Sequence, residues 1–169
     1  NEFRIGTGSI LVWQSAQCVT VQSATGTIQE NVWQHVAVAR EGNSFNLYRD
    51  GARVGTGNSS CTFSSAAQLP TIFDWFANND NQFNGTADDL AVWNISLSSE
   101  IIAKHSGYGI DRSIYGNNAT FINGTGGMNV NQSGKFQEAM DFYRGEVRIP
   151  TRNLNHTKGT LEFWFKIRS

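Results

Sequence analysis

The sequence predicts an all-β protein, a two-sheet antiparallel jelly-roll sandwich with one short helix. Its 169 residues include 17 glycines, only 2 prolines and 12% aromatic residues, a composition typical of short strands joined by tight turns. Short apolar segments alternate with polar turns along the whole chain. Residues 160–167 alternate between an apolar and a mixed face, as in a strand that packs one face on a core.

Strand-like segments recur from one end of the chain to the other. They cover residues 10–13, 18–21, 36–38, 45–49, 52–54, 72–76, 90–93, 140–142, 146–149 and 160–167. Asp50-Gly51 predicts a two-residue hairpin turn, because both central positions of such a turn need positive φ. Residues 55–68 are rich in Ser, Thr and Gly and are expected to form a loop, with at most one short strand.

One helix is expected, at residues 98–104. Ser98 is a good N-cap, Glu100 lies near the positive end of the helix dipole and Lys104 near the negative end. We expect only one or two turns.

Charge and hydropathy exclude several partners. The chain has 13 Lys and Arg against 14 Asp and Glu, without a run of one sign, which argues against nucleic acid. No apolar run approaches the length of a membrane span, so no membrane insertion is expected. The chain begins at Asn1 without an initiator methionine or a signal peptide, and we expect it to be processed or excised from a longer one.

Glycan acceptor motifs are more frequent than chance predicts. Random placement of 17 Asn among 28 Ser and Thr would give about three N-x-S/T motifs, whereas the chain has seven. These candidate glycosylation sites are Asn58, Asn84, Asn94, Asn118, Asn123, Asn131 and Asn155. Because Asn, Ser and Thr also cluster in turns, some excess arises without glycans. We interpret the motifs as the mark of an extracellular or cell-surface glycoprotein.

The chain has two cysteines, Cys18 and Cys61. Their spacing fits no zinc motif, so they are either two buried thiols or one disulfide. The glycan motifs favour an oxidising compartment, and we therefore expect the disulfide.

Several short motifs resemble those of the laminin-G-like, concanavalin A-like lectin superfamily. In the first part of the chain they are Trp33…His35-Val36-Ala37, Leu47-Tyr48…Asp50-Gly51, Phe83-Asn84-Gly85…Asp88 and Leu97-Ser98…Glu100-Ile101. In the second part they are Asp111…Gly116-Asn117-Asn118, Gly134-Lys135-Phe136…Ala139-Met140-Asp141-Phe142, Ile149-Pro150 and Leu161…Phe163-Trp164. Residues 1–30 are supported by strand pattern alone.

The resemblance implies that the two halves of the domain stand in rotated order. Residues 1–106 resemble the C-terminal half of a laminin-G-like module, and residues 107–169 resemble the N-terminal half of the same or the next module. Together they make one module. Three arrangements follow: a circular permutant that closes on itself, a head-to-tail polymer in which each half completes a neighbouring copy, or a window of a tandem array.

The resemblance also implies a calcium site. In many relatives, acidic residues near the positions of Asp88, Asp89 and Asp111 hold a structural Ca²⁺, whose preferred ligands are oxygens. The alternative is that Asp88 or Asp89 caps a turn through its carboxylate. The polar loop 78–81 is a second candidate for the ion.

Tryptophans are candidates for sugar stacking, because aromatic rings suit the apolar faces of pyranoses. Trp13, Trp75 and Trp164 qualify, although Trp in a sandwich is more often core. Trp164 is out of phase with its apolar neighbours and is the candidate ligand-binding residue. Trp33 and Trp93 lie in family motifs and are expected in the core.

No catalytic constellation is found. Glycosidases of this fold need carboxylates that alternate on one strand, whereas Glu162 stands alone between Leu161 and Phe163. His35 is expected to be structural, and His105 and His156 lie in turn-like contexts.

The sequence therefore predicts an extracellular, non-catalytic structural or adhesive module. Its expected partners are copies of itself, head-to-tail, or adjacent tandem modules, with assembly into a filament or surface array. The alternative is a lectin module that binds glycans, with or without calcium. A glycoside hydrolase ranks well below both.

Overall fold

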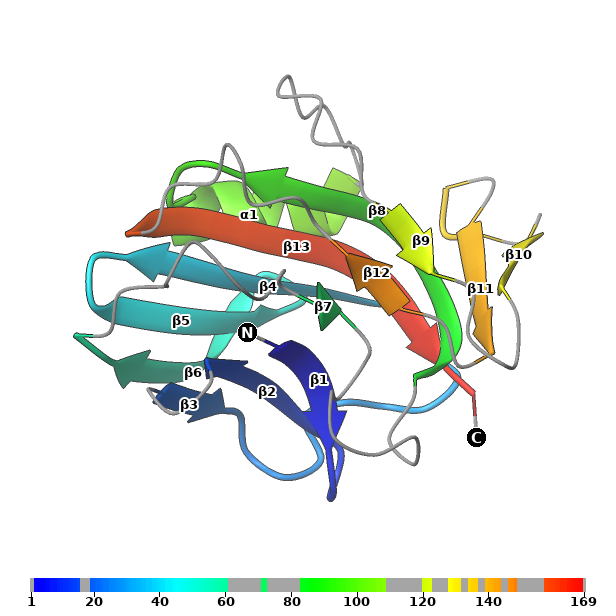
Figure 1. Ribbon diagram of the computed structural model, residues 1–169, viewed down its shortest axis with the longest axis horizontal. Coiled ribbons are helices and arrows are strands. Elements are labelled where there is room, and N and C mark those ends of the chain that lie inside the picture. Colours follow the sequence, from blue (N-terminus) through cyan, green and yellow to red (C-terminus); the bar gives the residue numbers. More distant parts are fainter. Residues whose placement is uncertain are drawn as a thin grey trace.

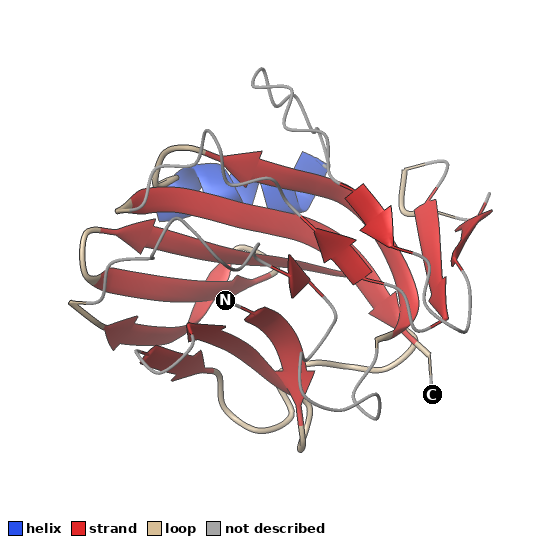
Figure 2. Cartoon of the chain, viewed as in Figure 1, coloured by secondary structure: helices blue, strands red, loops and turns tan. Residues whose placement is uncertain are grey.

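A computed structural model gives the fold of residues 2–15, 19–60, 71–72, 83–108, 120–122, 128–131, 134–136, 139–143, 146–148 and 157–168. Nearly all of the regular structure is strand, with one helix in the described part of the chain (Figure 2). The elements are β1 Glu2–Gly6, β2 Ile10–Ser15, β3 Val19–Gln22, β4 Gln34–Glu41, β5 Ser44–Arg49, β6 Ala52–Asn58, β7 Thr71–Ile72, β8 Asn84–Trp93, α1 Ser99–Tyr108, β9 Thr120–Ile122, β10 Met128–Asn131, β11 Ala139–Tyr143, β12 Glu146–Arg148 and β13 Lys158–Ile167.

The strands form two sheets, as the sequence predicts. The six-stranded sheet has the order β3-β2-β1-β7-β12-β9, and the seven-stranded sheet has the order β10-β11-β8-β13-β4-β5-β6. Among the strands of the described residues, all pairings are antiparallel except that of β1 with β7. In Figure 1 the six-stranded sheet lies in front of the seven-stranded sheet, and α1 lies behind it.

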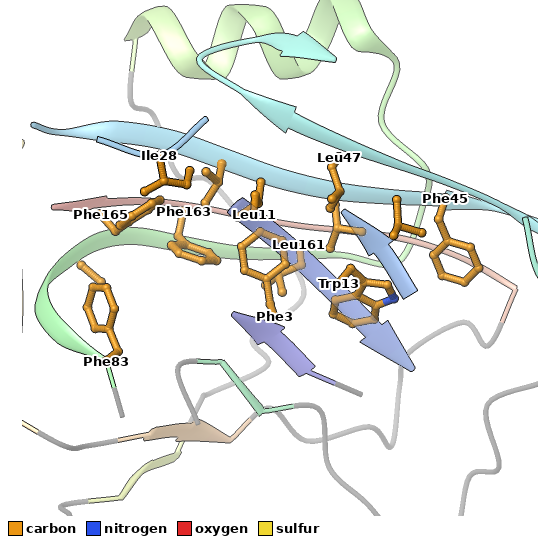
Figure 3. Packing of buried hydrophobic residues seen from close by; sticks show 14 of the residues in the cluster. Phe3, Leu11, Trp13, Ile28, Phe45, Leu47, Phe83, Leu161, Phe163 and Phe165 are labelled. Carbon is orange, nitrogen blue, oxygen red and sulfur yellow. The ribbon is translucent and has the colours of Figure 1, made fainter. Parts of the chain in front are cut away.

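The main core lies between the two sheets (Figure 3). The six-stranded sheet contributes Phe3, Leu11, Trp13 and Val21; the seven-stranded sheet contributes Val36, Val38, Phe45, Leu47, Ala87, Phe142, Leu161, Phe163 and Phe165; Ile28 and Phe83 join from loops. Phe3 meets Phe163 edge to face, with ring centroids 5.2 Å apart. Burial of these apolar side chains is the main force that holds the sheets together.

The central strand of the seven-stranded sheet comes from the end of the chain. β13 pairs with β4 on one side and with β8 on the other. In addition, β11 pairs with β8, and β12 pairs with β7. The strands of residues 107–169 are thus interleaved with those of residues 1–106, and both sheets need both parts.

The helix is longer than expected. Ser98 caps it as predicted, because its hydroxyl accepts a bond from the Ile101 amide at 3.3 Å. Glu100 pairs with Lys104 at 2.9 Å, and this bond holds the pKa of Glu100 below its usual value. The helix continues to Tyr108, and His105 in this extension contacts Glu162 and stacks on Trp93, tertiary contacts that propensity does not predict.

One further expectation is corrected, and three strands were not anticipated. Residues 55–58 are not loop but the end of β6, where an added Cβ at Gly55 would lie 2.7 Å from the Gln22 carbonyl. Strands β9 and β10 arise within the Gly/Asn-rich stretch 107–134, which has little apolar signal. β1 arises from residues 2–6, which were not expected as a separate strand.

Gly85 allows β13 to approach β8 closely. A Cβ on Gly85 would lie 2.4 Å from the Lys166 carbonyl oxygen and 3.1 Å from the Ile167 Cα. We expect Gly85→Ala to lower the free energy of unfolding by about 1–3 kcal/mol, because main-chain atoms must shift. The matched control is Gly159→Ala, whose Cβ would lie 3.3 Å from the Trp93 carbonyl and should cost less. Urea denaturation measures both, and equal effects would contradict the close approach.

Candidate functional site

The outer face of the seven-stranded sheet gathers the polar and aromatic residues that the sequence singles out. On β13, Thr160, Glu162 and Trp164 point away from the main core. Glu162 lies opposite Ala37 of β4 and Ala91 of β8, and Trp164 lies opposite His35 and Asp88. α1 covers part of this face through a second apolar cluster of Ala37, Ala39, Tyr48, Leu97 and Ile102, with Trp93 partly buried beside it.

Glu162 lies at the centre of this face and is 3% exposed. Its Oε1 accepts a hydrogen bond from Nε1 of Trp93 at 2.7 Å and lies 2.6 Å from Nδ1 of His105 on α1. The His105 ring also stacks on Trp93, with centroids 5.6 Å apart. A buried carboxylate needs such partners, since burial without them costs several kcal/mol.

His35 lies on the other side of Glu162 and is 2% exposed. Its Nε2 is 3.7 Å from Glu162 Oε2, and its Nδ1 has no hydrogen-bond partner among the described residues. Burial, and secondarily repulsion from His105, lowers the pKa of His35 from 6.5 to about 4. His35 is therefore a neutral, structural histidine at neutral pH, as the sequence predicts.

Trp164 lies on the outer face, as its phase in the strand predicts, but it is only 6% exposed. The Lys135 ammonium lies 4.6 Å from the ring centroid, and Phe136 and His35 meet the ring at its edge. A sugar could stack on Trp164 only if Lys135 and Phe136 moved away. The ligand-binding role of Trp164 stays a prediction.

The other tryptophans divide between core and surface. Trp13 is buried beside Phe3 in the main core. Trp93 packs partly on the second cluster, and Trp33 is half-buried with the Lys166 ammonium 5.4 Å from its ring centroid. Trp75 lies outside the described residues.

The Asp88 carboxylate accepts two main-chain hydrogen bonds. Its Oδ1 accepts a bond from the Asp89 amide at 2.9 Å, and its Oδ2 accepts one from the Phe136 amide at 3.0 Å. The bond from Phe136 ties residues 134–136 to β8 at a β-bulge, where Asp89 has φ of 49°. Asp88 thereby fixes the segment that carries Lys135 and Phe136 against the Trp164 ring.

The calcium site stays a prediction. Among the described residues, no three His, Cys, Asp or Glu side chains are grouped so as to hold a metal ion. Asp111 and the loop 78–81 lie outside those residues.

Asp141 forms a second polar contact between the two parts of the chain. It accepts a hydrogen bond from the Thr86 hydroxyl at 2.8 Å and pairs with the Arg168 guanidinium. The Arg168 amide donates to the Asn84 carbonyl at 3.0 Å. The residue that follows β13 is thus fixed to both β8 and β11.

The glycan motifs within the described strands lie at strand ends. Asn58 and Asn84 are exposed at the end of β6 and the start of β8, and Asn94 is half-buried just after β8. Asn131 ends β10. Asn118, Asn123 and Asn155 lie outside the described residues, as do Cys18, Cys61 and His156.

Sequence reasoning missed the role of His105. Its turn-like context gave no indication that helix α1 continues past residue 104 and brings the imidazole onto Glu162. Glu162 stands alone in sequence, but in space it has two histidines and a tryptophan around it. The one sequence signal for the contact between His105 and Glu162 is the alternation of β13, which places Glu162 on the outer face of the sheet.

The fold and this outer face define a two-sheet jelly-roll module. The family model of the concanavalin A-like lectin/glucanases superfamily, of laminin-G type, matches residues 2–103, more than half of the chain, and the chain belongs to this family. The match includes residues 2–30, for which strand pattern was the only support, and ends before β13. Neither the curated proteins nor the solved structures include a significant match to the chain.

Membership sets the broad class of function. Laminin-G-like modules are generally non-catalytic and typically extracellular. Within the described residues, no helix is long and apolar enough to cross a membrane.

Proposed function

We propose that the protein is an extracellular, non-catalytic structural or adhesive module that joins copies of itself by exchanging residues 107–169. One observation carries this proposal: β13, from the end of the chain, fills the position between β4 and β8. Without β13, both of those strands would present unpaired edges to solvent. A second copy's β13 would fill the same position with the same contacts.

The contacts of β13 favour neither intrachain closure nor exchange between copies. Intrachain closure and exchange between copies form the same main-chain bonds and bury the same apolar side chains, so the connection and the protein concentration decide the balance. In head-to-tail exchange each copy donates one β13 and accepts another, and the product grows as a filament. The glycan motifs fit an extracellular site, and a glycan on Asn58 would shield the edge strand β6 from unwanted pairing.

A disulfide trap tests the exchange. The Gly42 amide donates to the Thr157 carbonyl, so Glu41 and Lys158 form the adjacent non-hydrogen-bonded pair. In such a pair the Cα atoms are about 4.5 Å apart, within reach of a disulfide. Both side chains are about half exposed, and their salt bridge contributes little. We therefore expect Glu41→Cys/Lys158→Cys to crosslink readily under oxidation.

A non-reducing denaturing gel then separates the outcomes. Exchange predicts a ladder of covalent multimers that reducing agent converts to one band. The single variants Glu41→Cys and Lys158→Cys are the controls and should give at most dimers. A crosslinked chain of monomer mass only, together with a monodisperse monomer in native mass spectrometry, would overturn the exchange.

Glycan binding is the alternative function. It requires that Trp164 be uncovered, and Lys135 and Phe136 lie against its ring. A glycan-array signal that disappears in Trp164→Ala but persists in Trp33→Ala would favour this alternative.

A further inference from the structure

Three described side chains that surround Glu162 come from the other part of the chain. Trp93 lies on β8, His105 on α1 and His35 on β4, whereas Glu162 lies on β13. The closest contacts, 2.6 Å to His105 and 2.7 Å to Trp93, both involve Oε1. Residues 1–106 thus contain a set of groups that converge on one carboxylate of residues 107–169.

The space for this carboxylate is provided by small neighbours. Ala37 and Ala91 flank Glu162 on the two adjacent strands, and both are buried. Cross-strand neighbours lie about 5 Å apart at Cβ, so larger residues at these positions would fill the space that Glu162 occupies. Trp93 and His105 stack together and close this space on the outer side.

We propose that Trp93, His105 and His35 form a carboxylate pocket that recognises Glu162 and so selects which strand, in which register, enters between β4 and β8. Selection of a strand from another copy rests on the proposed function, whereas the pocket itself acts in either arrangement. The ligand class is a β-strand with one carboxylate on its outer face and large apolar residues on its inner face.

The pocket distinguishes registers as well as strands. A slip by one residue would bring Leu161 or Phe163 to the pocket and turn Glu162 into the main core, where no such partners are found among the described residues. A strand with an apolar residue at position 162 would leave the partly buried Trp93 N–H without this acceptor, which is costly. Because His105 belongs to α1, a correctly placed carboxylate also fixes the helix over the inserted strand.

A double-mutant cycle on the full chain tests the pocket. The variants are Glu162→Gln, His105→Gln and the double variant, with unfolding followed by circular dichroism in guanidinium chloride at pH 7. Glutamine keeps an acceptor for Trp93 but removes the charge. We expect Glu162→Gln to reduce the equilibrium ratio of folded to unfolded protein about 10- to 100-fold. The double variant should reduce this ratio by a factor at least about threefold smaller than the product of the two single-variant factors.

Glu41→Gln is the matched control, a carboxylate on β4 that is about half exposed and pairs with Lys158. We expect it to change the equilibrium by less than about fivefold. The pocket is overturned if Glu162→Gln behaves like this control, or if the losses of Glu162→Gln and His105→Gln simply multiply.

The wild-type chain provides a second readout that needs no variant. A carboxylate oxygen can only accept, so Nδ1 of His105 must carry a hydrogen, which nitrogen NMR of the imidazole detects directly. An Nδ1 without hydrogen at pH 7 would overturn the pocket even if Glu162→Gln failed to fold.

Failure of the pocket and failure of the exchange are distinguishable. A monomeric protein with strong coupling between Glu162 and His105 retains the pocket and rejects the exchange. A polymer without that coupling retains the exchange and rejects the pocket. If both hold, differently tagged wild-type and Glu162→Gln copies, unfolded and refolded together, should join less often than two wild-type copies.

Discussion

Replacing Phe163 with alanine is expected to lower the free energy of unfolding by about 3–5 kcal/mol. Phe163 is 1% exposed and lies at the centre of β13. Its ring meets Phe3 of the opposite sheet at 5.2 Å and Phe165 of its own strand at 5.9 Å. Truncation would leave a cavity between the sheets, where the first and second parts of the chain meet (Figure 3).

Urea or guanidinium denaturation at equilibrium measures this loss. Lys158→Ala is the control on the same strand, because its side chain is about half exposed and makes a surface salt bridge; we expect a loss below about 1 kcal/mol. A loss for Phe163→Ala as small as that of the control would mean that β13 does not lie in the core. If copies exchange β13, the unfolding midpoint will also rise with protein concentration.

The face of each β13 residue could be predicted from the sequence, because the side chains of a strand alternate with period two. Leu161, Phe163 and Phe165 lie in the core, and Glu162 and Trp164 lie on the outer face, as that period requires. The partners of the strand could not be predicted from pattern. β13 pairs with β4, more than a hundred residues earlier, and such long-range pairing leaves no local signal.

The resemblance to a known family supplied what the pattern lacked. It predicted that residues 107–169 complete a module with residues 1–106 in rotated order; the family model matches residues 2–103, and the rotated order stays a prediction. Strands β9 and β10 were missed because Gly, Asn and Thr dominate their surroundings and turn chemistry outweighs strand propensity there.

The outer-face site was only half predictable. The phase of β13 predicted that Glu162 and Trp164 share a face, and the position of His35 beside core strand residues predicted a structural role for it. The contact of His105 with Glu162 depends on the length of α1 and on its docking onto Ala37 and Ala39. The Asp89 bulge likewise brings Asp88 opposite Trp164, a local geometry that regular alternation does not anticipate.

Acid is expected to destabilise the folded module through His35. Its pKa is lowered to about 4 in the folded state, first by burial and then by repulsion from His105, against 6.5 when solvated. Between these values the unfolded chain binds a proton that the folded chain does not, so stability falls as pH drops from about 6.5 to about 4. A difference of 2.5 units corresponds to about 3 kcal/mol, all of it lost below pH 4.

Other groups face His35 and set the background of this measurement. Glu162 of β13 lies 3.7 Å from its Nε2, and His105 of α1 contacts the same carboxylate. Asp50, in the turn after β5, accepts a bond from the His35 amide at 2.9 Å, and Lys135 lies beyond Trp164. Protonation would place a hydrogen on the His35 Nδ1, for which no acceptor is found among the described residues. The loss of stability in acid therefore arises from protonation of the buried His35 imidazole.

His35→Gln isolates the contribution of the imidazole. The variant keeps the backbone bond to Asp50 but cannot titrate, so its unfolding free energy, measured in urea at pH 7, 6, 5 and 4, should fall by about 3 kcal/mol less than that of the wild type. Parallel pH profiles would mean that His35 is solvated in the folded chain. That result would also contradict the enclosed position of Glu162, since β4, α1 and β13 bury both side chains together. If copies exchange β13, the same pH interval should favour release of the exchanged strand, because release exposes His35 to water.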